Sequence, residues 1–528
     1  MWDRIAAVVL FAAFAADCAV LTLRNVHMLQ LNSYRPERYG RWMKAHRPEL
    51  WRTYGWLLIA LAAAVVQPLK ETDWTVRAAC AGLFAAHLIL NWPQKAKKPL
   101  VYTPRVRRLL VTHGILLAAV IAAVALTGMY RLGVAGLFLW AVLSPFVTLL
   151  ALLINQPMET AFTNRYIRDA RRRLAELPDL TVIGITGSYG KTSTKNFLHA
   201  LLSARYNVLM TPESYNTTLG VVRTIRERLQ PSHQVFIVEM GAKNPGDIRE
   251  ICDLVHPGYG MITAIGEQHL ETFRTVENIV ATKFELADAV PAGGVVFLNA
   301  DNGYIRQRLA EHPPAAKAVT YGVEADSAAA YTAVDLEVGP RGSSFTVRAP
   351  SGEEERFETR LLGAHNIQNL TGCIAVAHTL GIPLAELKYP VRMLRSVEHR
   401  LQLLPNGFID DAYNSNPAGF RAALDVLAGF EGQRVLVTPG MVELGERQEA
   451  LNRELGAYAA GRCDYAVLVG EKQAPPLKEG LLSAGFPEER LYVARDLKDG
   501  LEHLHTLPAP EAGQRRTVLL ENDLPDNF

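Results

Sequence analysis

The first 154 residues alternate between long apolar stretches and short basic connections. Five apolar stretches stand out, at residues 5–23, 54–69, 76–92, 109–126 and 132–154. A helix that crosses a bilayer needs about 20 apolar residues, with a range of roughly 17–25. The pattern therefore predicts an α-helical transmembrane region of about five helices over 1–154. The second and third stretches are short and interrupted by polar residues, so a re-entrant hairpin is the alternative for that pair.

Arginine and lysine gather in three segments that flank these stretches, at 24–52, 95–108 and 165–173. The positive-inside rule places such segments in the cytoplasm. An outside N-terminus with five crossings satisfies the rule, and three crossings would place the rest of the chain on the same side. We therefore expect a multi-pass protein with the lipid bilayer as a partner and its C-terminal two-thirds in the cytoplasm.

Three ionisable side chains, Asp17, His87 and His113, fall within the apolar stretches. Ionisable groups inside a membrane span are functional candidates by default. The simpler interpretation is that they lie near helix ends or form hydrogen bonds between helices. The sequence assigns them no role.

From residue 181 the pattern changes to short β-branched runs that alternate with helical stretches. Six runs predict buried strands, at 181–186, 234–240, 259–265, 294–300, 434–440 and 465–470. This alternation is typical of a doubly wound α/β sheet. Residues 330–360 alternate more strictly and predict antiparallel strands. With a break near 395–410, the predicted divisions are a transmembrane region 1–154, a basic linker 155–178, a central domain 179–398 and a C-terminal domain 399–528.

Charge and cysteine usage narrow the class of partner. The formal net charge is +2, so no overall field indicates nucleic acid, and we expect none as a partner. The five cysteines are scattered without metal-ligand spacing. A disulfide framework or zinc site is therefore not expected, and a reducing compartment fits.

The string GITGSYGKTSTK, residues 184–195, follows the strand predicted at 181–186 and opens a helix. Backbone N–H groups of such a turn, together with the helix N-terminus, cradle phosphates. Lys191 would reach the β- and γ-phosphates, and the Thr192 hydroxyl would ligate magnesium. The spacing is a compact variant of GxxxxGK[ST], because Ile185 stands where the first glycine belongs. The residues expected at the nucleotide are Gly187, Ser188, Gly190, Lys191, Thr192 and Ser193.

Three further residues have chemistry that suits such a site. Glu239 ends a predicted strand, where a carboxylate can hold magnesium directly or through water. His269 ends another predicted strand, although a lone histidine is more often structural than a ligand. Lys283 has no meaning from spacing alone, since any amphipathic surface helix carries such a lysine.

Nine ordered motifs over about 180–475 resemble those of the Mur ligases, most closely the branch that adds D-alanyl-D-alanine to UDP-N-acetylmuramoyl-tripeptide. They are GITGSYGKTSTK, SYNTTLGVV, VEMGAKNPGDI, AIGEQHLETF, ATKFEL, LNADN, GAHNIQNLTGCIAVA, HRLQLLPNGFIDDAYNSNP and GMVELGE. The resemblance implies a central P-loop domain plus a Rossmann-like C-terminal domain. It also implies ATP-dependent amide-bond formation in the cell-wall synthesis of a bacterium. A carboxylate attacks the γ-phosphate, and an amine then displaces phosphate from the acyl phosphate.

The resemblance implies roles for the metal-site residues. Lys191 and Thr192 would serve the phosphates and a first Mg²⁺, together with Glu239. His269 would help to bind a second Mg²⁺. Lys283 matches the position at which family members often carry a carbamylated lysine, whose oxygens suit a hard cation.

The resemblance also implies nucleotide and substrate contacts. Asn366 and Asn369 match the adenine-side motif, and Arg400 and Asp411 match the residues that meet the nucleotide from the C-terminal domain. The remaining matches belong to the substrate side: Asn216, Thr217, Tyr413 and Asn414. Closure of the C-terminal domain over ATP would complete the site and exclude water.

Three departures from the branch leave the substrates open. Apolar helices stand where the branch has a domain that grips the UDP-sugar, and no uridine site is evident. An Asp is missing before the Met of GMVELGE, and the chain end lacks a Lys-Gly-Ser stretch. The resemblance implies a muropeptide or another carboxylate as one substrate, UDP-linked or lipid-linked, and an amino acid or dipeptide as the amine, with D-alanyl-D-alanine the first choice. The alternatives are a membrane ligase similar to poly-γ-glutamate synthetase, or an ATPase or membrane scaffold without ligase activity.

Overall fold

The computed structural model describes residues 2–66, 74–92, 99–127, 133–267, 270–324, 328–413, 416–442, 444, 447–470 and 473–522. The chain divides into two compact units, unit 1 (Met1–Arg165) and unit 2 (Tyr166–Phe528).

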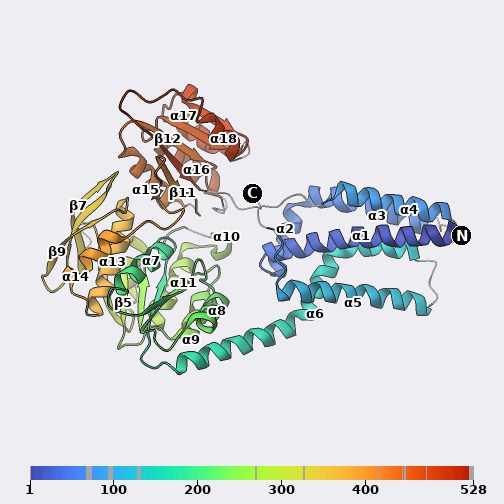
Figure 1. Cartoon of the computed structure of the whole chain (residues 1–528), viewed down its shortest axis with the longest axis horizontal. Coiled ribbons are helices and arrows are strands. Elements are labelled where there is room, and N and C mark those ends of the chain that lie inside the picture. The colour runs from blue at the N-terminus through green and yellow to red at the C-terminus, as the bar shows by residue number, and fades with distance from the viewer. Residues whose placement is uncertain are drawn as a thin grey trace. The chain divides into compact units, whose positions relative to one another are not determined.

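The regular elements among the described residues of unit 1 are all helices. Its helices are α1 (Trp2–Leu31), α2 (Pro36–Ala45), α3 (Arg47–Val66), α4 (Trp74–Leu90), α5 (Pro104–Thr127) and the first part of α6 (Gly133–Ala175). Figure 1 shows the long helices lying lengthwise beside one another. Each predicted apolar stretch thus overlaps a helix over its described residues. The segment predicted as a basic linker is helical as far as residue 175, since α6 continues through it without interruption.

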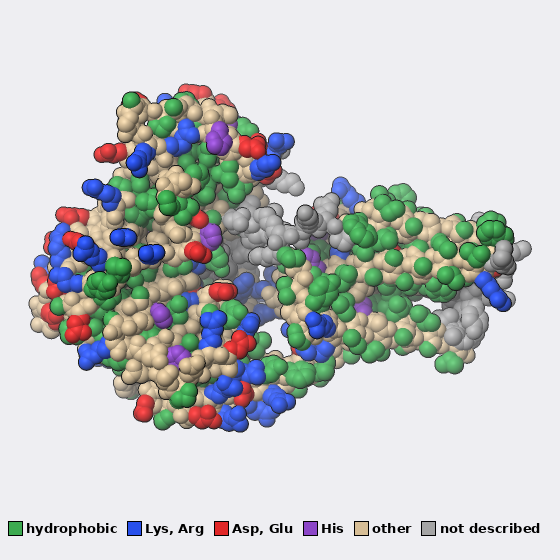
Figure 2. Space-filling model, in the orientation of Figure 1, with side chains coloured by type: hydrophobic (Ala, Val, Ile, Leu, Met, Phe, Trp, Pro, Cys, Tyr) green, Lys and Arg blue, Asp and Glu red, His purple; other side chains and the backbone are tan. Residues whose placement is uncertain are grey.

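Unit 1 exposes many large apolar side chains, which cover its surface in Figure 2. Among the described residues, three helices are long and apolar enough to cross a membrane, Trp2–Leu31, Pro104–Ala123 and Ala135–Ala175, and Trp74–Leu90 is a shorter apolar helix. A water-soluble bundle would direct such side chains inward. This surface suits a hydrocarbon environment, and insertion of about five helices into a bilayer stays a prediction.

The polar side chains inside unit 1 bond between helices. Asp17 of α1 accepts a hydrogen bond at 2.6 Å from Nδ1 of His87 on α4, and Nε2 of His87 lies 2.7 Å from the Thr53 carbonyl oxygen of α3. Asn25 donates to Ser144 of α6 at 3.0 Å. The simpler interpretation is therefore confirmed for Asp17 and His87. His113 is buried on α5.

The first part of unit 2 is built on a nine-stranded sheet of order β2-β3-β1-β4-β5-β6-β7-β8-β9. The strands up to β7 pair in parallel, and β7, β8 and β9 form an antiparallel edge, as predicted for 330–360. The strands are β1 (Thr181–Thr186), β2 (Val208–Met210), β3 (Val235–Glu239), β4 (Tyr259–Ile262), β5 (Val295–Asn299), β6 (Lys317–Gly322), β7 (Tyr331–Gly339), β8 (Gly342–Arg348) and β9 (Glu354–Thr359).

Helices cover both faces of this sheet. The helices α7 (Lys191–Leu202), α13 (Ala364–Thr379) and α14 (Leu384–Met393) bury one face, where Phe297 of β5 points. The other face, with Val296 and Leu298, is covered by α8 (Thr218–Arg228), α9 (Asp247–Val255), α11 (Val276–Ala289) and α12 (Gly303–Glu311). The short α10 spans Leu270–Phe273. Strands buried on both sides explain the continuous apolar runs of the sequence.

The last part of unit 2 is a six-stranded sheet of order β10-β11-β15-β12-β13-β14, parallel except for β10. Its strands are β10 (Gln402–Leu403), β11 (Phe408–Asp411), β12 (Gln433–Thr438), β13 (Tyr465–Val469), β14 (Leu491–Ala494) and β15 (Arg516–Glu521). Its helices are α15 (Pro417–Ala428), α16 (Gln448–Ala459), α17 (Ala474–Ser483), the 3₁₀ turn Glu488–Arg490 and α18 (Leu497–His503). The α/β prediction is confirmed, since each of the six predicted runs contains a strand.

Candidate active site

The glycine loop joins β1 to α7 in the conformation that its sequence requires. Gly190 has φ +79°, and a Cβ atom there would lie 2.8 Å from Nδ2 of Asn369. Gly187 lies against Thr263 so closely that a Cβ would meet its hydroxyl at 2.1 Å. Both positions therefore demand glycine, because a left-handed φ and a close approach each exclude a side chain. The loop leaves backbone N–H groups at the N-terminus of α7, which favours bound anions.

The loop that follows β4 braces the glycine loop. The Ser188 N–H donates to the Ala264 carbonyl at 2.6 Å, and the Gly266 N–H donates to the Ser188 hydroxyl at 3.2 Å. The Tyr189 hydroxyl donates to the Glu267 carbonyl at 3.2 Å. The phosphate-binding conformation is thus held by contacts outside the loop itself.

Lys191 folds back over the loop. Its Nζ donates to the carbonyl oxygens of Gly187 at 2.7 Å and Ser188 at 3.1 Å. Burial lowers the pKa of the Lys191 ammonium to about 8, the Glu239 carboxylate counteracts part of that effect, and Arg400 adds to it. The Lys191 ammonium is therefore within the glycine loop, where a bound phosphate could accept the hydrogen bonds that the Gly187 and Ser188 carbonyls now accept.

Glu239 is the centre of the polar cluster beside the loop. At the end of β3, it is 1% exposed and accepts hydrogen bonds from Thr192 at 3.2 Å and Asn216 at 3.1 Å. Its other oxygen lies 3.0 Å from Nζ of Lys195, which is equally buried. Burial by itself would raise the pKa of Glu239, but Lys195 and Lys191 outweigh it and hold the pKa below its ordinary value. The structure thus brings Thr192, Asn216 and Glu239 together, as predicted, around an ionised carboxylate.

Lys195 is a residue of this polar cluster that the sequence analysis missed. It is one turn beyond Lys191 on α7, and its Nζ also donates to the Glu213 carbonyl at 2.6 Å. The available signal was its spacing, since residues i and i+4 lie on the same side of a helix. The role of Lys195 as the counterion of Glu239 becomes visible only in the structure, where both side chains are buried and in contact.

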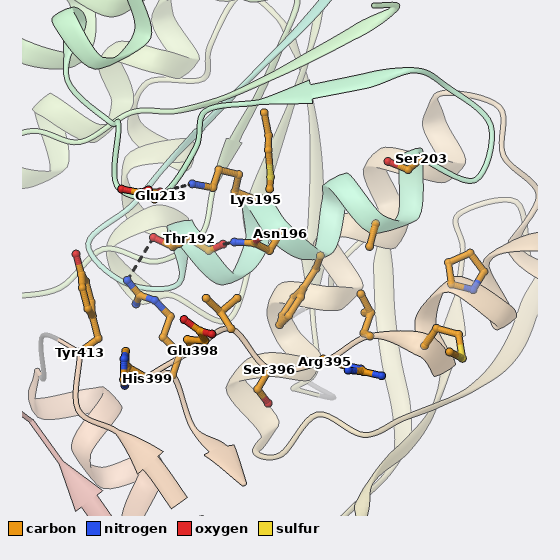
Figure 3. A pocket seen from close by; sticks show the side chains of 18 of the residues that line it. Thr192, Lys195, Asn196, Ser203, Glu213, Arg395, Ser396, Glu398, His399 and Tyr413 are labelled. Carbon is orange, nitrogen blue, oxygen red and sulfur yellow. Dashed lines mark hydrogen bonds between the residues drawn. The ribbon is translucent and has the colours of Figure 1, made fainter. Parts of the chain in front are cut away.

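Arg400 reaches this cluster from the segment that leads into the C-terminal sheet. Its guanidinium donates to the Thr192 hydroxyl at 3.3 Å and lies 4.7 Å from the centre of the Tyr413 ring. Burial lowers its pKa, while Glu239 acts in the opposite direction. Figure 3 shows Thr192 and Tyr413 on the two sides of this meeting point. Arg400 therefore lies beside the glycine loop, and its contact with the nucleotide stays a prediction.

Asp411, predicted beside the nucleotide, instead holds the segment that carries Arg400. Its Oδ1 accepts a hydrogen bond from the Leu401 N–H at 2.9 Å. Burial raises the pKa of Asp411 to about 6. Its role at the nucleotide stays a prediction, and its present contacts are those of a positioning residue.

Four other predicted residues, all within the described ranges, have no hydrogen bond to Glu239. Lys283 is 3% exposed on α11, and burial first, then the charge of Lys191, lowers its pKa to about 7. Asn366 is buried and donates to the Leu362 carbonyl at 2.8 Å. Ser193 is buried on α7, and the Thr217 hydroxyl caps α8 by accepting from the Gly220 N–H at 3.3 Å.

The expectations for His269 and Asn414 lie outside the described residues. Within the described ranges, no three His, Cys, Asp or Glu side chains form a group that could hold a metal ion. The oxygens that do suit Mg²⁺ are those of Thr192, Asn216 and Glu239, a donor set of the hard type that this cation prefers.

Comparison with known proteins accounts for both parts of unit 2. Residues 185–377 match the family model described as the Mur ligase middle domain, and residues 399–520 match the Mur ligase, glutamate ligase domain. Neither match includes the first 184 residues.

Several curated relatives share the name UDP-N-acetylmuramoyl-tripeptide--D-alanyl-D-alanine ligase. The chain is 31% identical to that of Escherichia coli (strain K12) over 336 residues, which is 61% of this chain and 73% of the relative. It is 29% identical to that of Bacillus subtilis (strain 168) over 327 residues, 61% of this chain and 69% of the relative.

A crystal structure of MurF from Acinetobacter baumannii superimposes with a TM-score of 0.61 at 27% identity, covering 68% of this chain and 76% of that one. The MurF ligase of Thermotoga maritima in complex with ADP has the same fold, with a TM-score of 0.59 at 23% identity. With a glycine loop, a buried carboxylate and an arginine arranged as above, the chain belongs to the Mur ligase family of ATP-dependent, ADP-forming ligases.

Proposed function

We propose that this chain joins the carboxylate of a muropeptide to D-alanyl-D-alanine, at the cytoplasmic side of a bacterial membrane, during synthesis of a cell-wall precursor. The names of relatives at 29–31% identity support the two substrates. The observation that carries the proposal is the cluster of Lys191, Thr192, Glu239 and Arg400 beside the glycine loop, where side chains from both parts of unit 2 come together.

The residues present suit phosphoryl transfer followed by amide formation. The carboxylate oxygen attacks the γ-phosphorus, ADP leaves, and an acyl phosphate forms. Lys191 and Arg400 supply positive charge next to the transferring phosphoryl group, while the loop N–H groups hold the neighbouring phosphates. The amine nitrogen then attacks the acyl carbon, phosphate departs with the bonding electrons of the C–O bond, and the nitrogen loses a proton.

Mg²⁺ fits the oxygens of Thr192 and Glu239, and when bound it would neutralise charge on the phosphates. Glu239 is buried with its pKa held below its ordinary value, so it offers carboxylate oxygens to which Mg²⁺ would bind in place of the donors that now contact them. Asn216 orients the carboxylate through its 3.1 Å hydrogen bond. His269 is proposed for a second Mg²⁺ by the family resemblance.

Carbamylation of Lys283 is a further part of the proposal. Its amine is buried on α11, and an amine held neutral by its surroundings reacts with carbon dioxide. The resulting carbamate would replace a repelling ammonium by oxygens. The family resemblance at ATKFEL and the burial of this side chain support it.

Unit 1 is proposed to hold the enzyme at the bilayer and to take the place of the missing UDP-gripping domain by recruiting a lipid-linked muropeptide. The exposed apolar helices support this. The variant lacking residues 1–154 tests it with soluble UDP-tripeptide as acceptor. Turnover equal to that of the full chain would contradict a substrate-binding role for unit 1.

The substrate proposal is tested on the full chain in detergent, by phosphate release and product mass analysis with muropeptide acceptors. D-alanyl-D-alanine should give product, and glutamate should give none. Product with glutamate alone would favour the poly-γ-glutamate alternative. ATP hydrolysis that no amine or acceptor stimulates would favour an ATPase without ligase activity.

A further inference from the structure

Unit 1 contains a pair of titratable side chains that none of the roles proposed so far uses. Asp17 of α1 is 1% exposed and His87 of α4 is 4% exposed. Nδ1 of His87 lies 2.6 Å from Oδ1 of Asp17, and Nε2 lies 2.7 Å from the carbonyl oxygen of Thr53 on α3. One imidazole ring thus contacts two helices besides its own. An ionisable pair inside an apolar bundle is a functional candidate.

The contacts of His87 fix the number of protons that the pair carries. A backbone carbonyl oxygen can only accept a hydrogen bond, so Nε2 of His87 carries a proton. The 2.6 Å contact between Nδ1 and Asp17 needs a proton as well, because a lone pair on nitrogen would repel a carboxylate oxygen. The pair therefore holds one proton more than a neutral histidine and an ionised aspartate hold together. Its net charge is zero whichever of the two atoms carries this proton.

The surroundings of the pair supply no second counterion. Oδ2 of Asp17 has no hydrogen-bond partner in the part of the chain that the structure describes. The Arg24 guanidinium donates instead to the Thr53 hydroxyl at 2.7 Å. The bound proton is therefore what neutralises Asp17. The other ionisable side chains of this region are Cys18 on α1, Tyr39 on α2, Tyr54 on α3 and Cys80 on α4, while α5 and α6 contribute the apolar Leu117, Phe138 and Ala141.

Loss of the proton would break one of the two contacts of His87. The remaining ring proton would stay with Asp17, since a hydrogen bond to a carboxylate is stronger than one to a neutral carbonyl. Nε2 would then present a lone pair to the Thr53 carbonyl, and the contact between α4 and α3 would be lost. The pair would also carry a negative charge among apolar side chains, which is costly. Both effects link the proton to the packing of α1, α3 and α4.

We propose that Asp17 and His87 form a proton-binding site, in which one bound proton keeps α4 in contact with α1 and α3 together. Water or a buffer base donates and accepts this proton, and no other bond changes. The inference concerns unit 1 alone and does not depend on the reaction at the glycine loop. Its consequence is that the packing of these helices weakens as the pH rises. A hydrogen bond between neutral groups, such as that from Asn25 to Ser144, has no such dependence on pH.

Unfolding of the full chain by urea in a non-ionic detergent, followed by tryptophan fluorescence, tests the site. All seven tryptophans belong to unit 1, so the signal reports on this unit. An exposed histidine is mostly neutral above about pH 6.5. If the folded unit holds a proton that the unfolded chain releases, the unfolding equilibrium constant rises about tenfold per pH unit. The wild-type chain should show this rise from about pH 7 to about pH 8.

Two variants of the pair and one control separate the proton from the contacts. Asp17→Asn should remove the rise and keep the contacts, because its amide N–H can donate to the unprotonated Nδ1 while the Nε2 proton stays at Thr53. His87→Gln, which has no titrating side chain, should remove the rise as well, so the test does not depend on one variant. Ser144→Ala is the matched control: it removes a buried hydrogen bond between α1 and α6, and it should keep the tenfold rise.

A wild-type unfolding constant that stays the same from about pH 7 to about pH 8 would overturn the assignment. A tenfold rise that persists in Asp17→Asn or His87→Gln would also overturn it, because the proton would then be bound elsewhere. A rise that is lost in each folded variant of the pair and kept in Ser144→Ala would uphold the site. That result would stand even for a chain that forms no amide.

Discussion

Replacing Lys195 by Met isolates the energetic role of the buried ion pair with Glu239. Both side chains are 1% exposed and their charged atoms lie 3.0 Å apart. Removing one partner of a buried pair costs about 3–5 kcal/mol, because the other charge remains uncompensated. Glu239 would keep its hydrogen bonds from Thr192 and Asn216. We therefore expect a loss of about 3 kcal/mol in the free energy of unfolding of the middle domain.

The assay must report on unit 2 alone. All seven tryptophans lie within the first 140 residues, so intrinsic fluorescence reports on unit 1. Cys373 is fully buried beside α7, and its alkylation as a function of urea concentration, resolved by peptide mass spectrometry, follows the middle domain. Lys388→Met is the control, since it removes an exposed ion pair with Glu355 and should cost less than about 1 kcal/mol.

The dependence of the unfolding free energy on pH tests whether the charge of Glu239 causes this loss. In the wild-type chain the pKa of Glu239 is held below its ordinary value, so this group stabilises the fold at neutral pH and the contribution is lost as the pH falls through that lowered pKa. In Lys195→Met burial should raise this pKa instead. The deficit relative to wild type should then be greatest at neutral pH and shrink in acid.

Two outcomes would refute the reasoning. A loss below about 1 kcal/mol would mean that the pair behaves like an exposed one. A loss independent of pH would mean that charge is not its cause. The double variant Lys195→Met with Glu239→Gln should recover part of the lost stability, because no uncompensated charge remains.

Three further predictions concern single residues. Gly190→Ala should weaken binding of an ATP analogue at least about tenfold, because it adds a clash with Asn369 to backbone strain; Gly246→Ala, with φ +88° and open space, controls for strain at another site and should bind normally. Since burial raises the pKa of Asp411 to about 6, the C-terminal domain should lose stability as the pH rises from about 4 through 6. Asp411→Asn should flatten this dependence of stability on pH, measured by urea-dependent alkylation of Cys463. An unchanged dependence in the variant would contradict the prediction. Protein exposed to ¹³C-labelled bicarbonate should show a carbamate NMR signal that Lys283→Ala lacks, and a signal in both would assign it elsewhere.

The sequence predicted the sheet well where burial is two-sided. Runs such as 181–186 and 465–470 are continuous and apolar, and each contains a strand. It missed six strands, β2, β6, β10, β11, β14 and β15. Most of them are short, and a strand of two to four residues has too few positions to show a period, while β15 joins its sheet between β11 and β12 through long-range parallel pairing. Pairing partners of high sequence separation leave no local signal.

The sequence predicted those site residues whose side-chain chemistry and position next to a motif indicate a function. Lys191, Thr192 and Glu239 stand at strand and helix ends, where the sequence itself indicates a function. Lys195 was not recognised because its importance comes from burial beside Glu239. The groove that lies along α7 beside the polar cluster could not be predicted from the sequence, because the residues that line it come from α7 and from the distant segment 394–400.

Amide formation driven by ATP at the glycine loop is measured most directly by following ADP and amide product together. The full chain in detergent receives ATP, magnesium, a muropeptide acceptor and D-alanyl-D-alanine. The wild-type chain should produce ADP and amide in equal amounts, and Lys191→Ala should produce neither while its unit 1 tryptophan fluorescence is unchanged. Full amide formation by Lys191→Ala, or ADP release that does not depend on the amine and acceptor, would contradict the account.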